Sequence, residues 1–286
     1  ALKGGNFRLR SMEYLIFGDG YLGNKIHNYL KDSFLSQKRI ESVKDVQEEL
    51  EKHKPKVVIN CIGKTGRPNI DWCEDHKTET HYGNVIVPFY ILQACQEKNL
   101  YLVHLGSGCI YSGNNDQNGW SEEDEPNFFG SYYSRTKILS EKLLKEYENV
   151  LILRLRLPID ETNDQRNLIN KLLKYNKIID VQNSITVFPN MLMPLKQLME
   201  KRVTGIINFV NKGPIKYREL LSLFEQITGK EKWYEFISES ELRKVTKADR
   251  SNCTLSTKKI ESLGIKITNI NDALKETFAL YAKNNI

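Results

Sequence analysis

The chain lacks several features that would place it in particular classes of protein. None of its 286 residues belongs to an apolar run approaching 18 residues, so the sequence predicts no membrane-spanning helix. The net charge of +6 is modest and no basic stripe stands out, so we expect no nucleic-acid partner. Internal repeats and low-complexity linkers are also missing. With 40% hydrophobic residues, the composition fits a globular chain with one large α/β unit, alone or with a small lobe.

Cysteine and histidine lack the spacing that metal sites require. The five cysteines are odd in number and scattered over positions 61, 73, 95, 109 and 253, and the five histidines form no ligand pattern. The sequence therefore predicts no metal site and no disulfide framework, and it favours a reducing, cytoplasmic environment. Residues 1–11 resemble a remnant of an expression vector, since Met12 stands where a native start would lie.

A glycine-rich turn is the first positive signal. Gly18, Gly20 and Gly23 follow a strand-like segment, 14–17, and open a helix-like segment, 21–30. Glycines in this context permit a tight turn and let backbone N–H groups approach a pyrophosphate at the start of a helix. An ordinary strand-to-helix turn is the alternative, but the position favours a dinucleotide site that includes Tyr21 and Leu22.

Two further segments are expected to contact the same cofactor. The third strand ends with four residues that would face its adenosine or pyrophosphate side: Asn60, Cys61, Ile62 and Gly63. The end of the second strand lacks the acidic residue that binds the ribose 2′-hydroxyl of NAD. Lys38 and Arg39 stand there instead, and either could pair with a 2′-phosphate. We therefore expect NADPH, with NADH as a weaker alternative, and favour Arg39 over Lys38 as the contact.

The alternation of elements predicts an α/β fold with a Rossmann-type doubly wound parallel sheet. Expected strands cover 13–17, 56–60, 100–106 and 150–154, and expected helices cover 21–32, 43–53, 78–98 and 131–147. The later pattern is less regular, with helices near 165–176, 190–201, 216–228, 238–245 and 269–284 and a strand near 206–210. We expect an NADP-binding Rossmann domain over 12–155. Residues 156–286 would supply one or two further strands and a smaller C-terminal substrate-binding lobe.

A hydroxyl, a phenol and an ammonium are predicted to meet at the carboxyl edge of this sheet. Ser107 follows the apolar run 100–105 at the end of the expected strand, and Tyr133 and Lys137 lie at i and i+4, on one face of a helix. Together they would polarise a carbonyl group and protonate it. Lys137 and the nicotinamide cation are expected to lower the pKa of the phenol from about 10. Cys109 adds a thiol that a plain carbonyl reductase does not need.

Several longer strings resemble one family. They are GRPNIDWCE (66–74), GCI (108–110), NFFGSYYSRTK (127–137), RLRLPI (154–159) and RSN (250–252). The chain is similar to the extended short-chain dehydrogenase/reductases that act on nucleotide-sugars. Within that group it most resembles the bifunctional 3,5-epimerase/4-reductase family of plant-type UDP-rhamnose synthesis.

The resemblance implies a chemistry and a set of catalytic residues. The substrate would be UDP-4-keto-6-deoxy-D-glucose, whose C3 and C5 protons are acidic because they lie next to the C4 ketone. Cys109 and Lys171 would exchange those protons on opposite ring faces. Ser107, Tyr133 and Lys137 would then serve NADPH-dependent reduction at C4, giving UDP-L-rhamnose. Two alternatives remain: a reductase-only dTDP-4-dehydrorhamnose reductase, and a non-catalytic NADP-binding regulatory protein.

Other residues are expected to bind the substrate or brace the site. Gly108 and four residues of the loop after the third strand would line the sugar pocket: Arg67, Asn69, Asp71 and Trp72. Trp72 fits core packing equally well. Arg250 resembles an arginine of the family that contacts a diphosphate, and Asn84 could brace the catalytic strand. By analogy with the fold, we also expect a homodimer.

Overall fold

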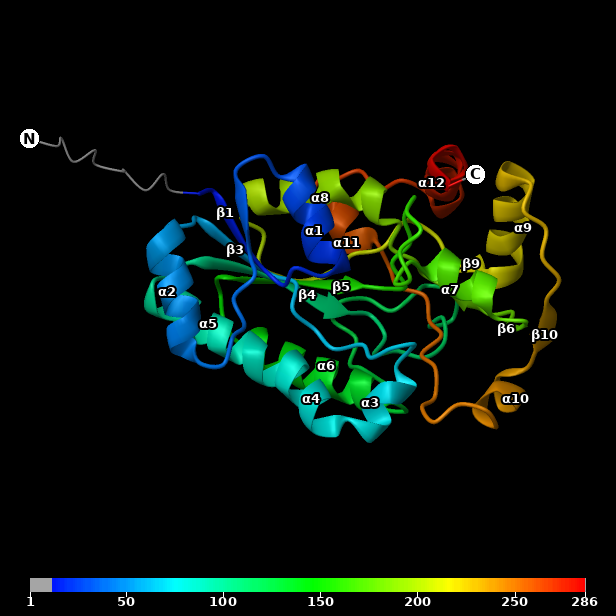
Figure 1. Cartoon of the computed structure of the whole chain (residues 1–286), viewed down its shortest axis with the longest axis horizontal. Helices are drawn as coiled ribbons and strands as arrows, with labels where there is room; N and C mark the ends of the chain where they lie inside the picture. Colours follow the sequence, from blue (N-terminus) through cyan, green and yellow to red (C-terminus); the bar gives the residue numbers. More distant parts are fainter. Residues whose placement is uncertain (1–11, 286) are drawn as a thin grey trace, which may run out of the picture.

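The computed structural model describes residues 12–285 and is built around one six-stranded parallel sheet (Figure 1). Residue 286 and residues 1–11, the expected vector remnant, lie outside the described part. The strands are β1 (Tyr14–Phe17), β2 (Ser33–Ser36), β3 (Val57–Asn60), β4 (Tyr101–Ser107), β5 (Val150–Leu155) and β8 (Gly205–Asn208). Their order is β2-β1-β3-β4-β5-β8, and every neighbouring pair is parallel. The predicted α/β class with a doubly wound parallel sheet is therefore confirmed.

Helices cover both faces of the sheet because its strands are apolar on both sides. One face packs against α1 (Tyr21–Tyr29), α8 (Phe188–Glu200) and α11 (Lys258–Ser262). The other packs against α2 (Val43–His53), α5 (Val87–Glu97) and α6 (Tyr132–Leu144). Within β1, Ile16 belongs to the first core layer, and Leu15 and Phe17 belong to the second. Among residues 12–285, no helix is long and apolar enough to cross a membrane.

One expected helix, 78–98, is divided in the structure. It consists of α4 (Lys77–His81), a π-helical turn η1 (Tyr82–Ile86) and α5. Asn84 lies in the π turn, where its side chain accepts the Lys64 N–H (2.7 Å) and donates to the Lys64 carbonyl (3.0 Å). Pro88 is the second residue of α5, in the first turn of the helix, where its missing N–H is tolerated. The wider turn thus places an amide where it can hold the loop after β3.

The part of the chain after β5 supplies one strand to the main sheet and a smaller lobe with its own apolar core (Figure 1). This lobe contains two two-stranded sheets, β6 (Lys177–Ile179) with β10 (Glu235–Ile237) and β7 (Gln182–Asn183) with β9 (Ile215–Lys216). Its helices are α7 (Leu168–Lys174), α9 (Tyr217–Thr228), α10 (Glu239–Arg243) and α12 (Ile270–Asn285). Sequence periodicity missed these short strands, as it missed α3 (Asp71–Asp75). The domain boundary at 155/156 stays a prediction.

A buried ion pair fixes α6 against the sheet. Arg154 on β5 donates from Nε and Nη2 to the two oxygens of Glu141, at 2.9 and 2.7 Å. The two residues are 1% and 6% exposed. Because Glu141 lies one turn after Lys137, this pair sets the position of the predicted catalytic helix.

Glu141→Ala should lower the free energy of unfolding by about 3–5 kcal/mol, because it leaves the Arg154 guanidinium buried without its carboxylate. Urea denaturation would measure the loss. Glu146→Ala, at an exposed position of the segment that follows α6, is the control and should stay within about 0.5 kcal/mol of the parent. A Glu141→Ala chain as stable as this control would contradict the assigned role.

Candidate active site

A cavity of about 880 Å³ lies at the carboxyl ends of β1, β3, β4 and β5, against the C-terminal lobe. The chain reverses its winding direction between β1 and β3, which are neighbours in the sheet. Such a switch point is where open α/β sheets bind their ligands. The cavity draws its lining from the glycine-rich turn, from the ends of β3, β4 and β5, from α6 and from the lobe.

The glycine-rich turn has the geometry that a pyrophosphate requires. A Cβ atom on Gly23 would lie 1.8 Å from the Gly18 carbonyl oxygen, and Gly18 has a φ of +99°. Gly20 is the N-cap of α1, which has no side-chain cap and no acidic residue in its first turn. Gly20, Tyr21 and Leu22 line the cavity, whereas Gly18 and Gly23 pack behind the turn. The first N–H groups of α1 are thus available for an anion.

The end of β3 forms the next part of the wall. Cys61, Ile62 and Gly63 line the cavity. Asn60 is fully buried behind them, hydrogen bonded to His104 at 3.1 Å and accepting the Ile62 N–H at 2.9 Å. Asn60 therefore shapes this turn from behind and does not face the cavity.

Asn84 braces a different part of the site from the one that we expected. Its amide donates to the Thr136 hydroxyl of α6 at 3.0 Å and holds both backbone groups of Lys64. It therefore connects the loop after β3 to the catalytic helix. The predicted brace on the catalytic strand β4 is wrong, because the side chain is already used between these two elements.

The predicted hydroxyl, phenol and ammonium lie on one wall of the cavity. Ser107 ends β4, and Tyr133 and Lys137 project from α6, which Ser131 caps by accepting the Ser134 N–H at 3.0 Å. The Ser134 hydroxyl donates to the Cys109 carbonyl at 2.5 Å. These contacts hold α6 against the turn after β4, so local capping and strand ends bring the three groups together.

Burial determines how the phenol and the ammonium titrate. It raises the pKa of Tyr133, and the charge of Cys109 raises it further, while a hydrogen bond from Ser107 lowers it. Burial lowers the pKa of Lys137 to about 8. Its ammonium donates to the Leu105 carbonyl at 3.1 Å. In the protein alone, burial therefore sets the direction of the Tyr133 pKa, and the lowering expected from Lys137 together with the nicotinamide cation stays a prediction.

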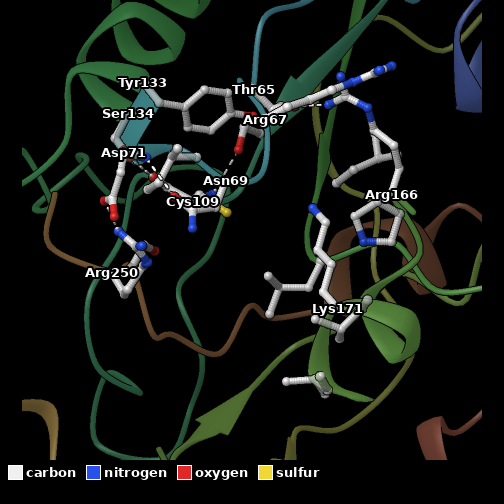
Figure 2. A pocket seen from close by; sticks show the side chains of 18 of the residues that line it. Thr65, Arg67, Asn69, Asp71, Cys109, Tyr133, Ser134, Arg166, Lys171 and Arg250 are labelled. Atoms are coloured by element: carbon white, nitrogen blue, oxygen red, sulfur yellow. Dashed lines mark hydrogen bonds and ion pairs between the residues drawn. The ribbon is translucent and has the colours of Figure 1, made fainter. Parts of the chain in front are cut away.

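Cys109 and Lys171 both line the cavity. Figure 2 shows Lys171 reaching from α7 toward the side that holds Cys109 and Tyr133. Burial lowers the pKa of Lys171, and the neighbouring charge of Arg166 lowers it further. A lysine with a lowered pKa exchanges protons more readily near neutral pH.

Three of the residues predicted to bind the sugar lie after β3, and one of them also contacts the C-terminal lobe. Arg67, Asn69 and Asp71 line the cavity, as expected. Asp71 accepts the Arg250 Nη1–H at 2.8 Å and the Ala248 N–H at 3.0 Å, so it holds the C-terminal lobe (Figure 2).

Two predicted substrate contacts face away from the cavity. Trp72 stacks on His76 with 3.9 Å between ring centroids and is outside the lining. Of the two roles considered for Trp72, sugar binding and packing, the structure supports packing. Gly108 is also outside the lining: a Cβ there would lie 2.6 Å from Leu255 and 2.8 Å from Arg156, so this glycine serves close packing.

The two candidate 2′-phosphate contacts lie outside the cavity lining. The Arg39 side chain is 86% exposed and pairs with Glu41 at 3.0 Å. Lys38 pairs with Glu48 at 2.6 Å and with Asp45 at 3.5 Å. Arg39 is therefore the more accessible cation, and its role stays a prediction.

The cavity also contains residues that sequence reasoning missed. Arg166 and Tyr217 line it from the C-terminal lobe, and Thr65 lines it from the loop after β3. They belong to no local motif, and only the folded chain brings them together. Within residues 12–285, no group of three or more metal-ligating side chains is placed to hold an ion.

The fold and this site define a Rossmann-type reductase with a serine, tyrosine and lysine on the cavity wall. The chain belongs to the family described as the RmlD substrate binding domain, which matches residues 12–283.

Two curated relatives come from Arabidopsis thaliana. A bifunctional dTDP-4-dehydrorhamnose 3,5-epimerase/dTDP-4-dehydrorhamnose reductase is 35% identical over 92% of this chain and 91% of its own length. A trifunctional UDP-glucose 4,6-dehydratase/UDP-4-keto-6-deoxy-D-glucose 3,5-epimerase/UDP-4-keto-L-rhamnose-reductase is also 35% identical over 92% of the chain. The chain spans only 41% of that longer protein.

Solved structures agree with this assignment. The UDP-rhamnose synthase of Acanthamoeba polyphaga mimivirus has a TM-score of 0.89 and 32% identity, over 95% of this chain and 100% of its own. A dTDP-4-dehydrorhamnose reductase of Bacillus anthracis, solved with NADP, has a TM-score of 0.81 over 94% of this chain and 99% of its own. At 17% identity, the second structure supports the fold alone.

Proposed function

We propose that this chain reduces the C4 ketone of a nucleotide-linked 4-keto-6-deoxyhexose, the 4-keto form of rhamnose, using NADPH. The observation that carries the proposal is the placement of Ser107, Tyr133 and Lys137 on the wall of a cavity that also contains the open start of α1. Relatives that the chain covers almost completely carry the names of dehydrorhamnose reductase and UDP-rhamnose synthase.

Each residue has a defined part in this reduction. NADPH, when bound, supplies the hydride that reaches C4. The Ser107 hydroxyl donates a hydrogen bond to the ketone oxygen, and Tyr133 gives that oxygen its proton. The raised pKa of Tyr133 keeps the phenol protonated at neutral pH, as a proton donor requires. The start of α1 and Lys137 would hold the cofactor.

A second candidate activity is epimerisation at C3 and C5, which would yield UDP-L-rhamnose from UDP-4-keto-6-deoxy-D-glucose. Cys109 and Lys171 in the same cavity favour it, as does the bifunctional name of one relative of similar length. The comparisons support the reductase better, because solved reductases of this fold match the chain over 99–100% of their own length. The regulatory alternative has less support, since all three reductase groups are present.

One assay separates these candidates. The chain is incubated with NADPH and either UDP-4-keto-6-deoxy-D-glucose or the pre-epimerised 4-keto-rhamnose nucleotide, and the loss of NADPH absorbance is followed. A reductase consumes NADPH with the second substrate, and a bifunctional enzyme with both. No consumption with either the UDP or the dTDP form would contradict the proposal. The homodimer and the cytoplasmic location stay predictions.

Arg39→Ala should weaken NADPH binding at least ten-fold more than NADH binding, because a charge-assisted phosphate contact contributes roughly 1.5–3 kcal/mol. Fluorescence titration with both cofactors would measure this. Arg202→Ala, at an exposed position after α8, serves as the control. An equal loss for both cofactors would show that Arg39 does not bind the 2′-phosphate, and Lys38 would be tested next.

NADPH affinity should also fall as the pH rises through about 8, the value to which burial lowers the pKa of Lys137. The side chain is charged below this pH and neutral above it, so the cofactor loses a cation on the alkaline side. The expected slope is about ten-fold per pH unit for a single proton. In Lys137→Met the slope should disappear, and a flat profile for the parent chain would contradict the prediction.

A further inference from the structure

Three arginines line the cavity, and they differ in what neutralises them. Arg250 is paired: its Nη1 lies 2.8 Å from Asp71 Oδ1 and also donates to the Ala248 carbonyl at 2.7 Å. Its charge is therefore balanced by a carboxylate of the protein. This weakens the expectation that Arg250 is the main contact for a diphosphate.

Arg67 and Arg166 have no such partner. The Arg166 guanidinium donates to the hydroxyl of Thr65, in the loop after β3. The hydrogen bond between Arg166 and Asp164 is made by the backbone N–H of Arg166, at 2.7 Å, and not by its guanidinium. The Arg67 side chain is exposed and forms no hydrogen bond within residues 12–285. In that described part of the chain, neither guanidinium makes an ion pair.

Positive charge consequently accumulates on this side of the cavity. Burial lowers the pKa of Arg166, and the next largest cause is the charge of Arg67, which is larger than the opposing effect of the Asp164 carboxylate. The charge of Arg166 likewise lowers the pKa of Lys171. Figure 2 shows the Arg67 and Arg166 side chains on the same side of the cavity, with Lys171 below them. Like charges repel unless an anion lies between them, and guanidinium groups match phosphate oxygens in a bidentate geometry.

We propose that Arg67 and Arg166 form a clamp for the diphosphate group of a nucleotide ligand. The clamp joins the loop after β3 to the segment before α7, and it lines the same cavity as the start of α1. This inference rests on the proposed function, which provides two ligands with a diphosphate. Because the start of α1 already suits the cofactor, the clamp is assigned to the sugar nucleotide. Arg250, held by Asp71, then borders the site without neutralising the phosphates.

The test is isothermal titration calorimetry of the full chain with UDP, uridine and NADPH. Arg67→Met, Arg166→Met and the double variant are compared with Arg202→Met, an exposed arginine outside the cavity lining. Each single clamp variant should bind UDP at least ten-fold more weakly and uridine unchanged. Since both arginines would hold the same group, the double variant should lose less than the product of the two single losses.

Each outcome has a defined meaning. Weaker binding of UDP supports the clamp, whereas weaker binding of NADPH alone overturns its assignment to the sugar nucleotide. Unchanged binding of both ligands overturns it. Arg67 is exposed, so Arg67→Met should fold even if Arg166→Met does not, and it can decide the question alone. If the parent chain bound none of UDP, dTDP and NADPH, the proposed function itself would fail. That result differs from failure of the clamp, in which the parent chain binds these ligands and the variants bind them equally well.

Discussion

Tyr133→Phe is expected to abolish NADPH oxidation and to spare the exchange of substrate protons. The phenol is the proposed proton donor to the C4 oxygen, and loss of a general acid typically slows a reaction by roughly 10²–10⁴-fold. The protons at C3 and C5 would be handled by Cys109, which lies on the same side of the cavity as Tyr133, and by Lys171, which reaches toward them from α7 (Figure 2). The variant should therefore still incorporate deuterium from solvent at C3 or C5 of the 4-keto sugar, as mass spectrometry would show.

A matched control is available next to this residue. Tyr132 is also in the first turn of α6, is half-buried and lies outside the cavity lining. Tyr132→Phe removes the same hydroxyl and should retain near-parent NADPH oxidation. If Tyr133→Phe loses deuterium exchange as completely as it loses reduction, the two steps share the phenol and the proposed division of work is wrong. If it keeps NADPH oxidation, another group donates the proton.

The parts of this site that the sequence could predict are those set by local rules. The glycine-rich turn, Ser107 at a strand end and the pair Tyr133/Lys137 at helical spacing are each defined within a few residues. Parallel strands end at the same edge of a sheet, so these segments meet once the topology is known. For the same reason, the alternation of elements was sufficient to predict the doubly wound sheet.

The parts that could not be predicted depend on contacts between distant segments. Asp71 meets Arg250 across 179 residues and Arg166 meets Thr65 across 101, and no periodicity encodes either contact. The π turn at Asn84 likewise depends on Lys64 and Thr136. The pKa of Tyr133 in the protein alone likewise could not be predicted, because the burial that raises it is a property of the folded chain.

Cys109→Ala is expected to separate epimerisation from reduction, because the thiol is proposed to serve only the first. The substitution removes the thiol but leaves Ser107, Tyr133 and Lys137 in place. Reduction does not use a thiol, whereas proton exchange at C3 and C5 needs an acid and a base. The variant should reduce the pre-epimerised 4-keto-rhamnose nucleotide at a near-parent rate. With UDP-4-keto-6-deoxy-D-glucose, it should lose deuterium exchange and rhamnose formation by about 10²-fold or more.

Two controls make the result with Cys109→Ala decisive. Cys95→Ala removes a buried thiol of α5 outside the cavity lining and should leave both reactions intact. Lys171→Ala should behave like Cys109→Ala, because the lysine is the proposed second proton-transfer group. A correctly folded Cys109→Ala chain that makes UDP-L-rhamnose at the parent rate would exclude the thiol from the reaction. A parent chain that reduces the 4-keto-rhamnose nucleotide but exchanges no protons would establish the reductase alone, and Cys109 would then be a wall of the sugar pocket.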